Sequence, residues 1–467
     1  MIHRRAGRLR GGLLTLLTGA CLLGTMPAHA AIAGGPISLD GSLGRAPYSI
    51  RVPAHWNGTL ILYSHGYVIP GQPNPAPDVA NTPAGEWLAA HGYALAASAY
   101  SSTGWAVREG EHDGMALLAY FAAHVGRPSR TIAWGHSLGG LITANLVQRY
   151  PGSFAGALPM CGVLGGSVGA WNLQLDAAFA FKTLLAPRLP LAVVGIRSPL
   201  LNLVTAGRAL TAAQRTAAGR ARLSLVAALS GVPGWYDPSA PAPSDQATRE
   251  RAQYQWLSTI DLPFFFALRA DIEARAGGNP SWNTGVDYAA QLAASSQRAE
   301  VRALYRQAGL SLDADLGALR AAPRVAANPK AVHYLRRYTI FDGGLGLPVL
   351  TLHTTGDGLV PVSDERAYAS VVGAAGHAAL LRQAYIARAG HCTFTDAEML
   401  AAFQALLHRL DTGRWDGVAE PAALERRARA LQANLTAEHL DPGAAPPVYI
   451  PFGPDPFPRP YDERTAP

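Results

Sequence analysis

The segment at residues 134–140, Trp-Gly-His-Ser-Leu-Gly-Gly, constrains the fold of this chain more than any other. Residues 131–134 are apolar or β-branched and predict a buried strand, whereas 138–150 carries apolar residues at helical spacing. A Gly-x-Ser-x-Gly pattern between a strand and a helix is typical of a sharp turn that lifts a serine hydroxyl out of a sheet. We therefore expect Ser137 to be a nucleophile and the Leu138 N–H to be one donor to an oxyanion.

A serine hydroxyl needs a base to remove its proton and a third group to orient that base. His391 fits the base, because it lies between a predicted strand at 380–387 and a predicted helix that starts at Asp396. Asp357 fits the acid, because it follows a predicted strand at 348–353. The order serine, acid, histidine is the one that accompanies this type of serine turn.

Other residues compete for the role of the acid. Asp357 lies in the segment Thr-Gly-Asp-Gly-Leu-Val-Pro and could serve only to stabilise a turn. In that case Asp364 or Asp342 would be the acid.

The second oxyanion donor is expected in the loop after an early strand. A compact apolar run at 59–64 leads into Ser-His-Gly-Tyr, which suits this role. We expect the Tyr67 N–H to be the donor and Gly66 to give the loop its flexibility. His65 could be a second base, although bracing the loop is the role that we expect for it.

The pattern along the 467 residues predicts one α/β core with a large insertion. Strands alternate with helices over the first part of the core, 31–165, and sheet-like segments return at 348–415. The intervening residues 166–347 are rich in Ala, Leu and Arg and predict a helical cap, with Thr211 and Gln214 matching a capping box that would open a helix. The last part, 416–467, predicts a helix and a Pro-rich tail, either an extended strap or a loose end.

The first 30 residues have the features of a secretory signal peptide. Four arginines precede an apolar stretch at 13–23, and Ala28-His29-Ala30 fits a cleavage site after Ala30. We therefore expect a secreted or periplasmic protein without stable membrane insertion, because no other segment reaches about 18 uninterrupted apolar residues. Cleavage would remove four arginines and no acidic residue, which lowers the formal net charge from +7 to +3. That charge gives no reason to expect a nucleic-acid partner.

Cleavage would also remove Cys21 and leave two cysteines, Cys161 and Cys392. In an oxidising compartment these two residues are candidates for a disulfide, whereas two buried thiols are the alternative.

The order of Ser137, Asp357 and His391, the early His65-Gly66 pair and the interrupted sheet resemble the α/β-hydrolase superfamily, over roughly 45–165 and 348–412. The resemblance implies an α/β-hydrolase fold, with a mostly parallel sheet and a helical cap inserted before the acid-bearing strand, in the secreted esterase and lipase branch. The His391-Cys392 pair also resembles secreted tannases and feruloyl esterases, in which a disulfide ties the segments that carry serine and histidine. This chain departs from them, because His136 and not cysteine precedes Ser137.

Aromatic residues near the expected carboxyl edge of the sheet are candidates for the substrate pocket. Tyr100 and Trp105 follow a predicted strand and Trp171 opens the cap, so that they could hold an acyl or aryl group or simply pack in the core. Residues 262–266, Leu-Pro-Phe-Phe-Phe, could likewise line an apolar passage or be buried.

The motifs together predict a secreted serine hydrolase that cleaves small or polymeric carboxylic esters through an acyl-enzyme. A serine exopeptidase of the aminopeptidase type is the alternative, and a non-catalytic protein would have lost one member of the Ser-Asp-His set. The sequence contains no Gly-x-Gly-x-x-Gly, His-Glu-x-x-His or spaced Cys/His motif, so we expect no cofactor and no metal. Composition and motifs do not predict the oligomeric state.

Overall fold

The computed structural model describes residues 35–74, 76, 82–440, 443 and 445–461. The predicted signal peptide and its cleavage site lie outside the described residues. Within them, no helix combines the length and apolar character that crossing a membrane requires.

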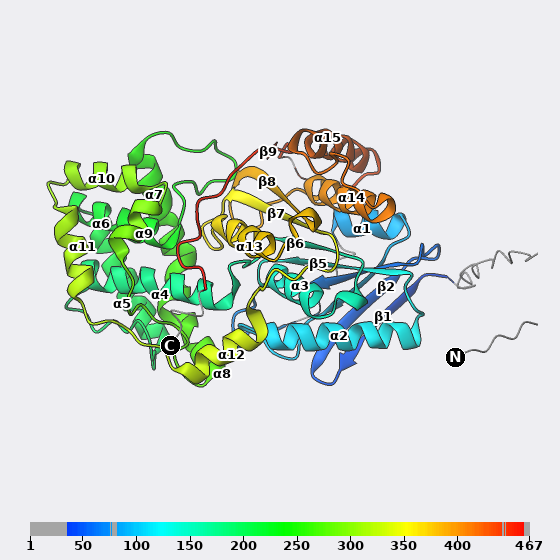
Figure 1. The fold of residues 1–467 in the computed structure, drawn as a ribbon, viewed down its shortest axis with the longest axis horizontal. Coiled ribbons are helices and arrows are strands. Elements are labelled where there is room, and N and C mark those ends of the chain that lie inside the picture. Colours follow the sequence, from blue (N-terminus) through cyan, green and yellow to red (C-terminus); the bar gives the residue numbers. More distant parts are fainter. Residues whose placement is uncertain (1–34, 75, 77–81, 441–442, 444, 462–467) are drawn as a thin grey trace, which may run out of the picture.

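A mostly parallel sheet forms the centre of the molecule (Figure 1). Its strands lie in the order β1-β2-β4-β3-β5-β6-β7-β8-β9. The pairs from β4 through β3, β5, β6 and β7 to β8 are parallel, and the outer pairs β1·β2, β2·β4 and β8·β9 are antiparallel. The strands are β1 Ile37–Leu43, β2 Ala46–Val52, β3 Thr59–Ser64, β4 Ala94–Ser98, β5 Arg130–His136, β6 Gly156–Met160, β7 Val349–Gly356, β8 Leu381–Ala389 and β9 Tyr449–Ile450.

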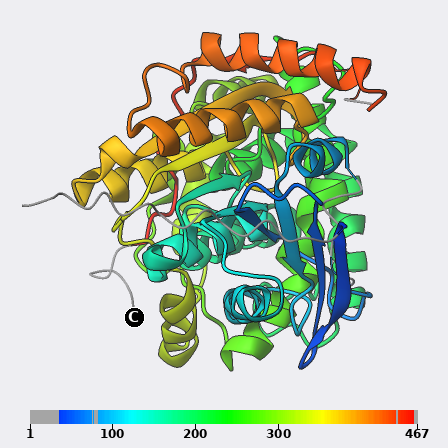
Figure 2. The same cartoon turned by 90° about the vertical axis from the view of Figure 1, so that its right-hand side faces the viewer.

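Helices cover both faces of this sheet, as Figure 2 shows. On one face lie α1 (Pro83–Ala90), α14 (Asp396–Thr412) and α15 (Pro421–Ala437), and on the other lie α2 (Val107–His124), α3 (Leu138–Arg149) and α13 (Ser363–Ala374). Successive strand side chains enter opposite cores: Leu60 and Leu62 pack on the α2–α3 side, and Ile61 packs on the α14 side. This double burial explains why the central strands are almost continuously apolar.

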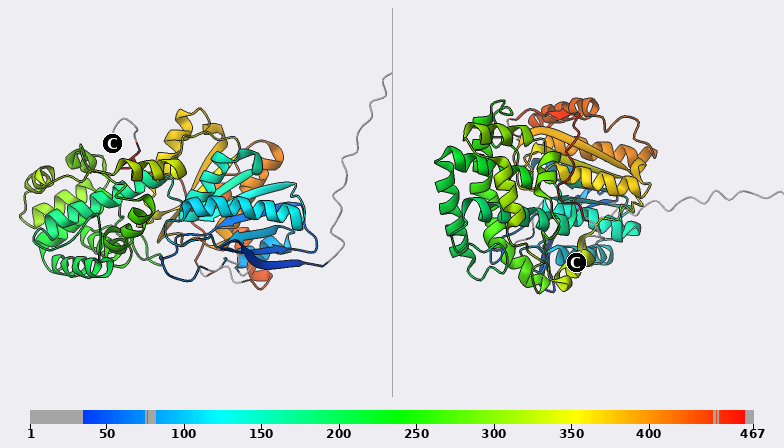
Figure 3. Two further views of the ribbon diagram at one scale, coloured as in Figure 1. Left: turned by 90° about the horizontal axis from the view of Figure 1, so that it is seen from below. Right: turned by 60° about the vertical axis from the view of Figure 1, so that its left-hand side comes forward.

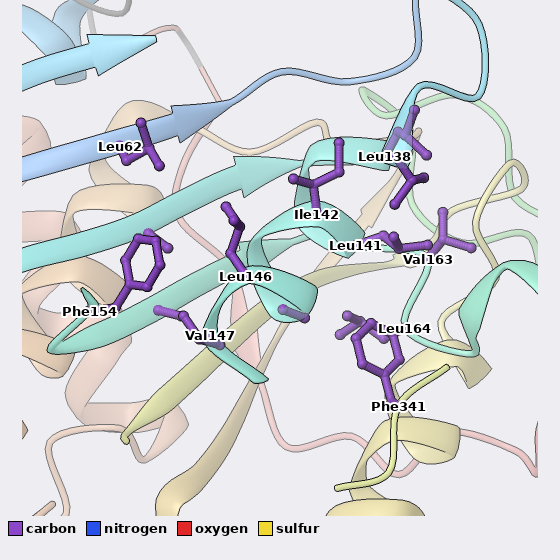
Figure 4. Packing of buried hydrophobic residues seen from close by; sticks show 14 of the residues in the cluster. Leu62, Leu138, Leu141, Ile142, Leu146, Val147, Phe154, Val163, Leu164 and Phe341 are labelled. Carbon is purple, nitrogen blue, oxygen red and sulfur yellow. The ribbon is translucent and has the colours of Figure 1, made fainter. Parts of the chain in front are cut away.

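Helix α3 is held against the sheet by its whole apolar face (Figure 4). Leu141, Ile142, Leu146 and Val147 are fully buried, at the helical spacing seen in the sequence. Because the helix starts at Leu138, directly after Ser137, this packing fixes the position of the serine turn.

The cap is a separate helical layer beside the carboxyl ends of the strands (Figures 1 and 3). It lies between β6 and β7 and has its own apolar core. Its helices are α4 Gly166–Leu185, α5 Pro199–Gln214, α6 Ala217–Ser230, α7 Gln246–Trp256, α8 Arg269–Ala276, α9 Tyr288–Ala294, α10 Arg298–Gln307, α11 Leu312–Ala321 and α12 Pro329–Thr339, with π-helical segments η3 Leu257–Asp261 and η4 Phe264–Leu268 between α7 and α8.

The predicted helix start at Thr211 is wrong. Helix α5 already runs from Pro199 and ends at Gln214, and the next helix, α6, is capped by Thr216, whose side chain accepts a hydrogen bond from the Gly219 N–H. The Ser/Thr-x-x-Glu/Gln pattern is short, and here tertiary packing of α5 overrides it.

Residues 445–461 form an extended strap across core and cap, visible as the red chain in Figure 1. Strand β9 first extends the sheet at the β8 edge, and Phe457 is buried farther along the strap. Near its end, Arg459 makes two hydrogen bonds, of 2.6 and 2.8 Å, to the carboxylate of the fully buried Asp176 on α4. Of the two forms predicted for the tail, the described residues adopt the strap.

Replacing Arg459 by alanine should destabilise the fold, because it leaves the buried Asp176 carboxylate without its cation. We expect the free energy of unfolding to fall by about 3–5 kcal/mol, measured by urea denaturation. The double variant Asp176→Asn/Arg459→Met removes both charges and should recover part of the loss. Equal stability of Arg459→Ala and the wild type would contradict an anchoring role for the strap.

Candidate active site

The turn between β5 and α3 has the shape that its glycines predict. Ser137 has φ 57° and ψ −125°, in the left-handed half of the backbone map that L residues rarely occupy. A Cβ at Gly135 would collide with the Gly139 carbonyl oxygen, and one at Gly139 would collide with the carbonyl oxygen of Ser64 on β3. Glycine is therefore required at both positions, because only a residue without a Cβ atom lets the turn fit against the neighbouring strand.

Three side chains that are far apart in the sequence meet beside this turn. His391, which follows β8, places its Nε2 atom 2.8 Å from the Ser137 Oγ and its Nδ1 atom 2.7 Å from an oxygen of Asp357. Asp357 follows β7 and is almost completely buried; its other oxygen accepts hydrogen bonds of 3.0 Å from the N–H groups of Leu359 and Val360. This is the geometry that a serine nucleophile, a histidine base and an orienting carboxylate need.

The alternative acids lie elsewhere. Asp364 accepts a 2.8 Å hydrogen bond from the Gly165 N–H, and Asp342 accepts one of 2.8 Å from the Gly344 N–H. Among the described residues, His391 pairs with Asp357 and not with either of these acids. Asp357 does stabilise its own turn, but it does so with one oxygen while the other binds His391.

Cys161 and Cys392 are joined in a disulfide that closes a separation of 231 residues. Cys161 directly follows β6, and Cys392 directly follows His391, with its sulfur 3.4 Å from the His391 Nε2 atom. Both cysteines have positive φ angles, 43° and 56°. The bridge thus ties the histidine loop to the strand that neighbours the serine turn, and the two thiols are not available as separate metal ligands.

A buried histidine that the sequence analysis did not single out supports Asp357. His353 on β7 lies with Nδ1 3.1 Å from Glu365 and Nε2 3.0 Å from the Val360 carbonyl oxygen and 3.6 Å from an Asp357 oxygen. Burial lowers the pKa of His353, but the hydrogen bond and charge of Glu365 and the charge of Asp357 outweigh it and raise the pKa to about 9. His353 is therefore a cation beside the orienting carboxylate.

The loop after β3 approaches the serine turn as predicted for an oxyanion site. A Cβ at Gly66 would lie 3.3 Å from the Ser137 Cβ. Among the described residues, no acceptor is recorded for the backbone N–H of Tyr67 or Leu138, and both residues line the cavity in front of Ser137. His65 braces the loop: its Nδ1 atom is 2.7 Å from the Gly66 carbonyl oxygen, and burial lowers the pKa of its imidazole.

A largely apolar cavity opens on Ser137 between the core loops and the cap. Trp105 lines it, together with Phe264 and Phe265 of η4, whereas Phe266 is fully buried against Phe181. The lining residues are Tyr67, Trp105, Ser137, Leu138, Val163, Ala170, Leu173, Gln174, Ser230, Val232, Asp261, Phe264, Phe265, Gly358, Leu359, Val360, Pro361 and Asp364.

Two of the predicted pocket residues are not among those lining it. Tyr100 is buried, stacks on His65 at a ring distance of 3.9 Å and donates its hydroxyl hydrogen bond to the His65 carbonyl oxygen. Trp171 is buried with its ring edge-on to Trp105, at a ring distance of 5.2 Å. Trp171 thus supports Trp105 in the cavity wall, and Tyr100 supports His65 in the loop after β3. The cap residues Gln174 and Asp261 line it instead, and no motif in the sequence marks them.

The sheet order, the serine turn after β5, the acid after β7 and the histidine after β8 define the α/β-hydrolase fold, which is the fold of this chain. No model of a known protein family matches the sequence. An o-phthalyl amidase from Xanthobacter agilis is similar to it, with 29% identity over 430 residues that cover 84% of this chain and 91% of the relative.

Solved structures with similarity to the chain include two enzymes of Aspergillus oryzae. One is an esterase (14% identity, TM-score 0.36, covering 81% of this chain and 80% of that one), and the other is feruloyl esterase B (12%, 0.38, 81% of each). A rice cell wall degrading esterase from Xanthomonas oryzae is also similar (11%, 0.34, 84% and 86%).

The charge of His353 should make stability depend on pH. A histidine whose folded-state pKa exceeds the ordinary 6.5 stabilises the fold fully below that value, and the stabilisation is lost as the pH rises through about 9. We expect this group to lower the free energy of unfolding by up to about 3 kcal/mol across that range, measured by denaturant titration. His353→Gln should lack this part of the decline, and identical pH profiles for the two proteins would contradict the charged state.

Proposed function

We propose that this protein is a serine hydrolase that cleaves carboxylic amides and esters of a largely apolar acyl group. The observation that carries the proposal is the continuous hydrogen-bonded chain from Ser137 through His391 to Asp357, placed at the mouth of an apolar cavity. The proposed catalytic residues are these three. Leu138 and Tyr67 are the proposed oxyanion donors, and Trp105 is the proposed pocket residue from the core.

The proposed reaction follows from the roles of these groups. His391 Nε2 takes the proton of Ser137 as the oxygen attacks the carbonyl carbon, and Asp357 stabilises the imidazolium that forms. The N–H groups of Leu138 and Tyr67 stabilise the oxyanion, an interaction of which each donor typically supplies about 3–4 kcal/mol. His391 then passes its proton to the leaving alcohol or amine, and a water molecule releases the acid from the acyl-enzyme by the same steps.

Separate observations favour an ester and an amide as the bond that is cleaved. The resemblance of the sequence to the secreted esterase and lipase branch favours an ester, although the three residues themselves serve both bonds. The relative is named an amidase that acts on an o-phthalyl group, and its similarity extends over most of both chains, which favours an amide. An amide demands more of His391, because an amine leaves only after protonation. We further propose secretion, because the disulfide suits an oxidising compartment.

The proposal is tested with p-nitrophenyl and p-nitroanilide derivatives of the same acyl groups, butyryl and benzoyl. We expect turnover of at least one bond type, and Ser137→Ala should lower kcat by a factor of about 10⁴ or more with an unchanged thermal transition. Ser224→Ala is the matched control, because that buried hydroxyl binds only the Ala221 carbonyl oxygen within α6. Residual turnover by Ser137→Ala near the wild-type rate would contradict the proposed nucleophile.

A further inference from the structure

Asp261 is a buried acidic residue that lines the active-site cavity. Only 3% of its surface is exposed, and it belongs to the cavity lining together with Ser137. Its Oδ2 atom has no hydrogen-bond partner among the described residues. A buried carboxyl group without a partner costs free energy, so the fold does not benefit from it and a function outside the fold is the simpler explanation.

The helix that carries Asp261 has an irregular backbone at this position. The chain is helical from Gln246 to Ala276, but η3 and η4 widen it to π-helical turns, and the Leu262 N–H donates to the Leu257 carbonyl oxygen five residues earlier. Pro263 between them has no N–H to donate. The widened turns bring Asp261, Phe264 and Phe265 into the cavity lining, and π-helical turns of this kind are common at functional sites.

The other residues of the cavity lining indicate which kind of ligand Asp261 would bind. No Lys, Arg or His side chain belongs to its lining within the described residues. The other acid there, Asp364, is occupied by the Gly165 N–H, and burial raises the pKa of its carboxyl to about 7. Gln174 contributes a second buried oxygen, Oε1, without a partner. Two acceptor atoms without a hydrogen-bond partner in the described part of the chain, in a lining without a basic side chain, favour a ligand that brings hydrogen-bond donors and positive charge.

The protonation of Asp261 agrees with this requirement. Burial raises its pKa well above the ordinary value, and the negative charge of Asp357 raises it further. Both effects disfavour an isolated negative charge on Asp261, so the site favours a partner that is positively charged. A substrate carboxylate would find no basic side chain in the cavity lining, whereas an amine can take the carboxyl proton and form an ion pair with Asp261.

We propose that Asp261 is a specificity residue that binds a primary amino group of the substrate, with Gln174 as a second acceptor. The inference rests on the proposed hydrolase function and names its substrate class, amino-bearing carboxylic amides or esters. A neutral amine takes the proton of the Asp261 carboxyl group, which gives an ammonium ion and a carboxylate. If the substrate binds as an ammonium ion, the carboxyl proton is released to solvent.

The first experiment compares matched substrates. Glycyl, 4-aminobutyryl and 6-aminohexanoyl p-nitroanilides are paired with acetyl, butyryl and hexanoyl p-nitroanilides, and kcat/KM is measured for each. The wild type should prefer at least one amino substrate over its partner by about tenfold or more, and Asp261→Asn should reduce this ratio to near one. Preference for glycyl would also support the exopeptidase alternative, because it places the amino group next to the bond that is cleaved.

Glu250→Gln is the matched control, because it is another acid-to-amide change at a buried acid of the same continuous helix, and Glu250 does not line the cavity. It should keep the wild-type ratio. Asp261→Asn should unfold at a temperature equal to or above that of the wild type. If Asp261 had a structural role, its replacement would instead lower the unfolding temperature. A wild-type ratio near one for all pairs, or a ratio that survives in Asp261→Asn, overturns the inference while ester or amide turnover itself still supports the proposed function.

A binding measurement separates the two proposals if no substrate is cleaved. Calorimetry with Ser137→Ala compares hexylamine with hexanol and benzylamine with benzyl alcohol. Binding of an amine that is about tenfold or more tighter than binding of its alcohol, and that is lost in Ser137→Ala/Asp261→Asn, supports an amine site even where the proposed reaction fails. Equal binding of amines and alcohols overturns it.

Discussion

The tight backbone turn at Ser137 is the constraint on which the rest of the structure depends. It requires that the β3 backbone come within contact of Gly139, so that the positive φ of Ser137 is enforced by packing from the sheet and from α3. The turn aims the hydroxyl at the carboxyl edge of the sheet. At that edge the loops after β7 and β8 bring Asp357 and His391 within hydrogen-bond distance.

The remaining features hold this edge in place or cover it. The disulfide fixes the histidine loop to the end of β6. The charged His353 on β7 lies beside the Asp357 carboxylate and supports it. The cap covers the cavity, and the C-terminal strap fastens the cap to the core through the buried pair of Arg459 and Asp176. Core, cap and strap thus converge on one cavity, although they come from distant parts of the chain.

The core and the three central site residues could be predicted from the sequence because each has a local signature. The buried strands are apolar throughout, and the segments around Ser137, Asp357 and His391 combine glycines with a polar residue at a strand end. The cap residues that line the cavity, Gln174 and Asp261, have no such local signature. Tyr100 and Trp171 are aromatic residues at the right place in the chain, but whether a side chain faces a cavity or supports its wall depends on packing between elements.

Asp261 and His353 were beyond sequence reasoning for a related reason. Each is a titratable residue inside a regular element, and only the three-dimensional surroundings distinguish it from an ordinary exposed residue. Pro263 within a helical pattern was the one local sign of the widened turns. The bond that is cleaved is equally hidden, since the same three residues serve esters and amides.

The most direct test of this account is labelling with an organophosphorus fluoride, followed by intact mass measurement and peptide mapping. Such a reagent reacts with a serine only where a neighbouring base activates its hydroxyl. We predict a single adduct at Ser137, formed much more slowly in His391→Ala and absent in Ser137→Ala. An unlabelled protein, or an adduct on another residue, would contradict the claim that Ser137 is an activated nucleophile.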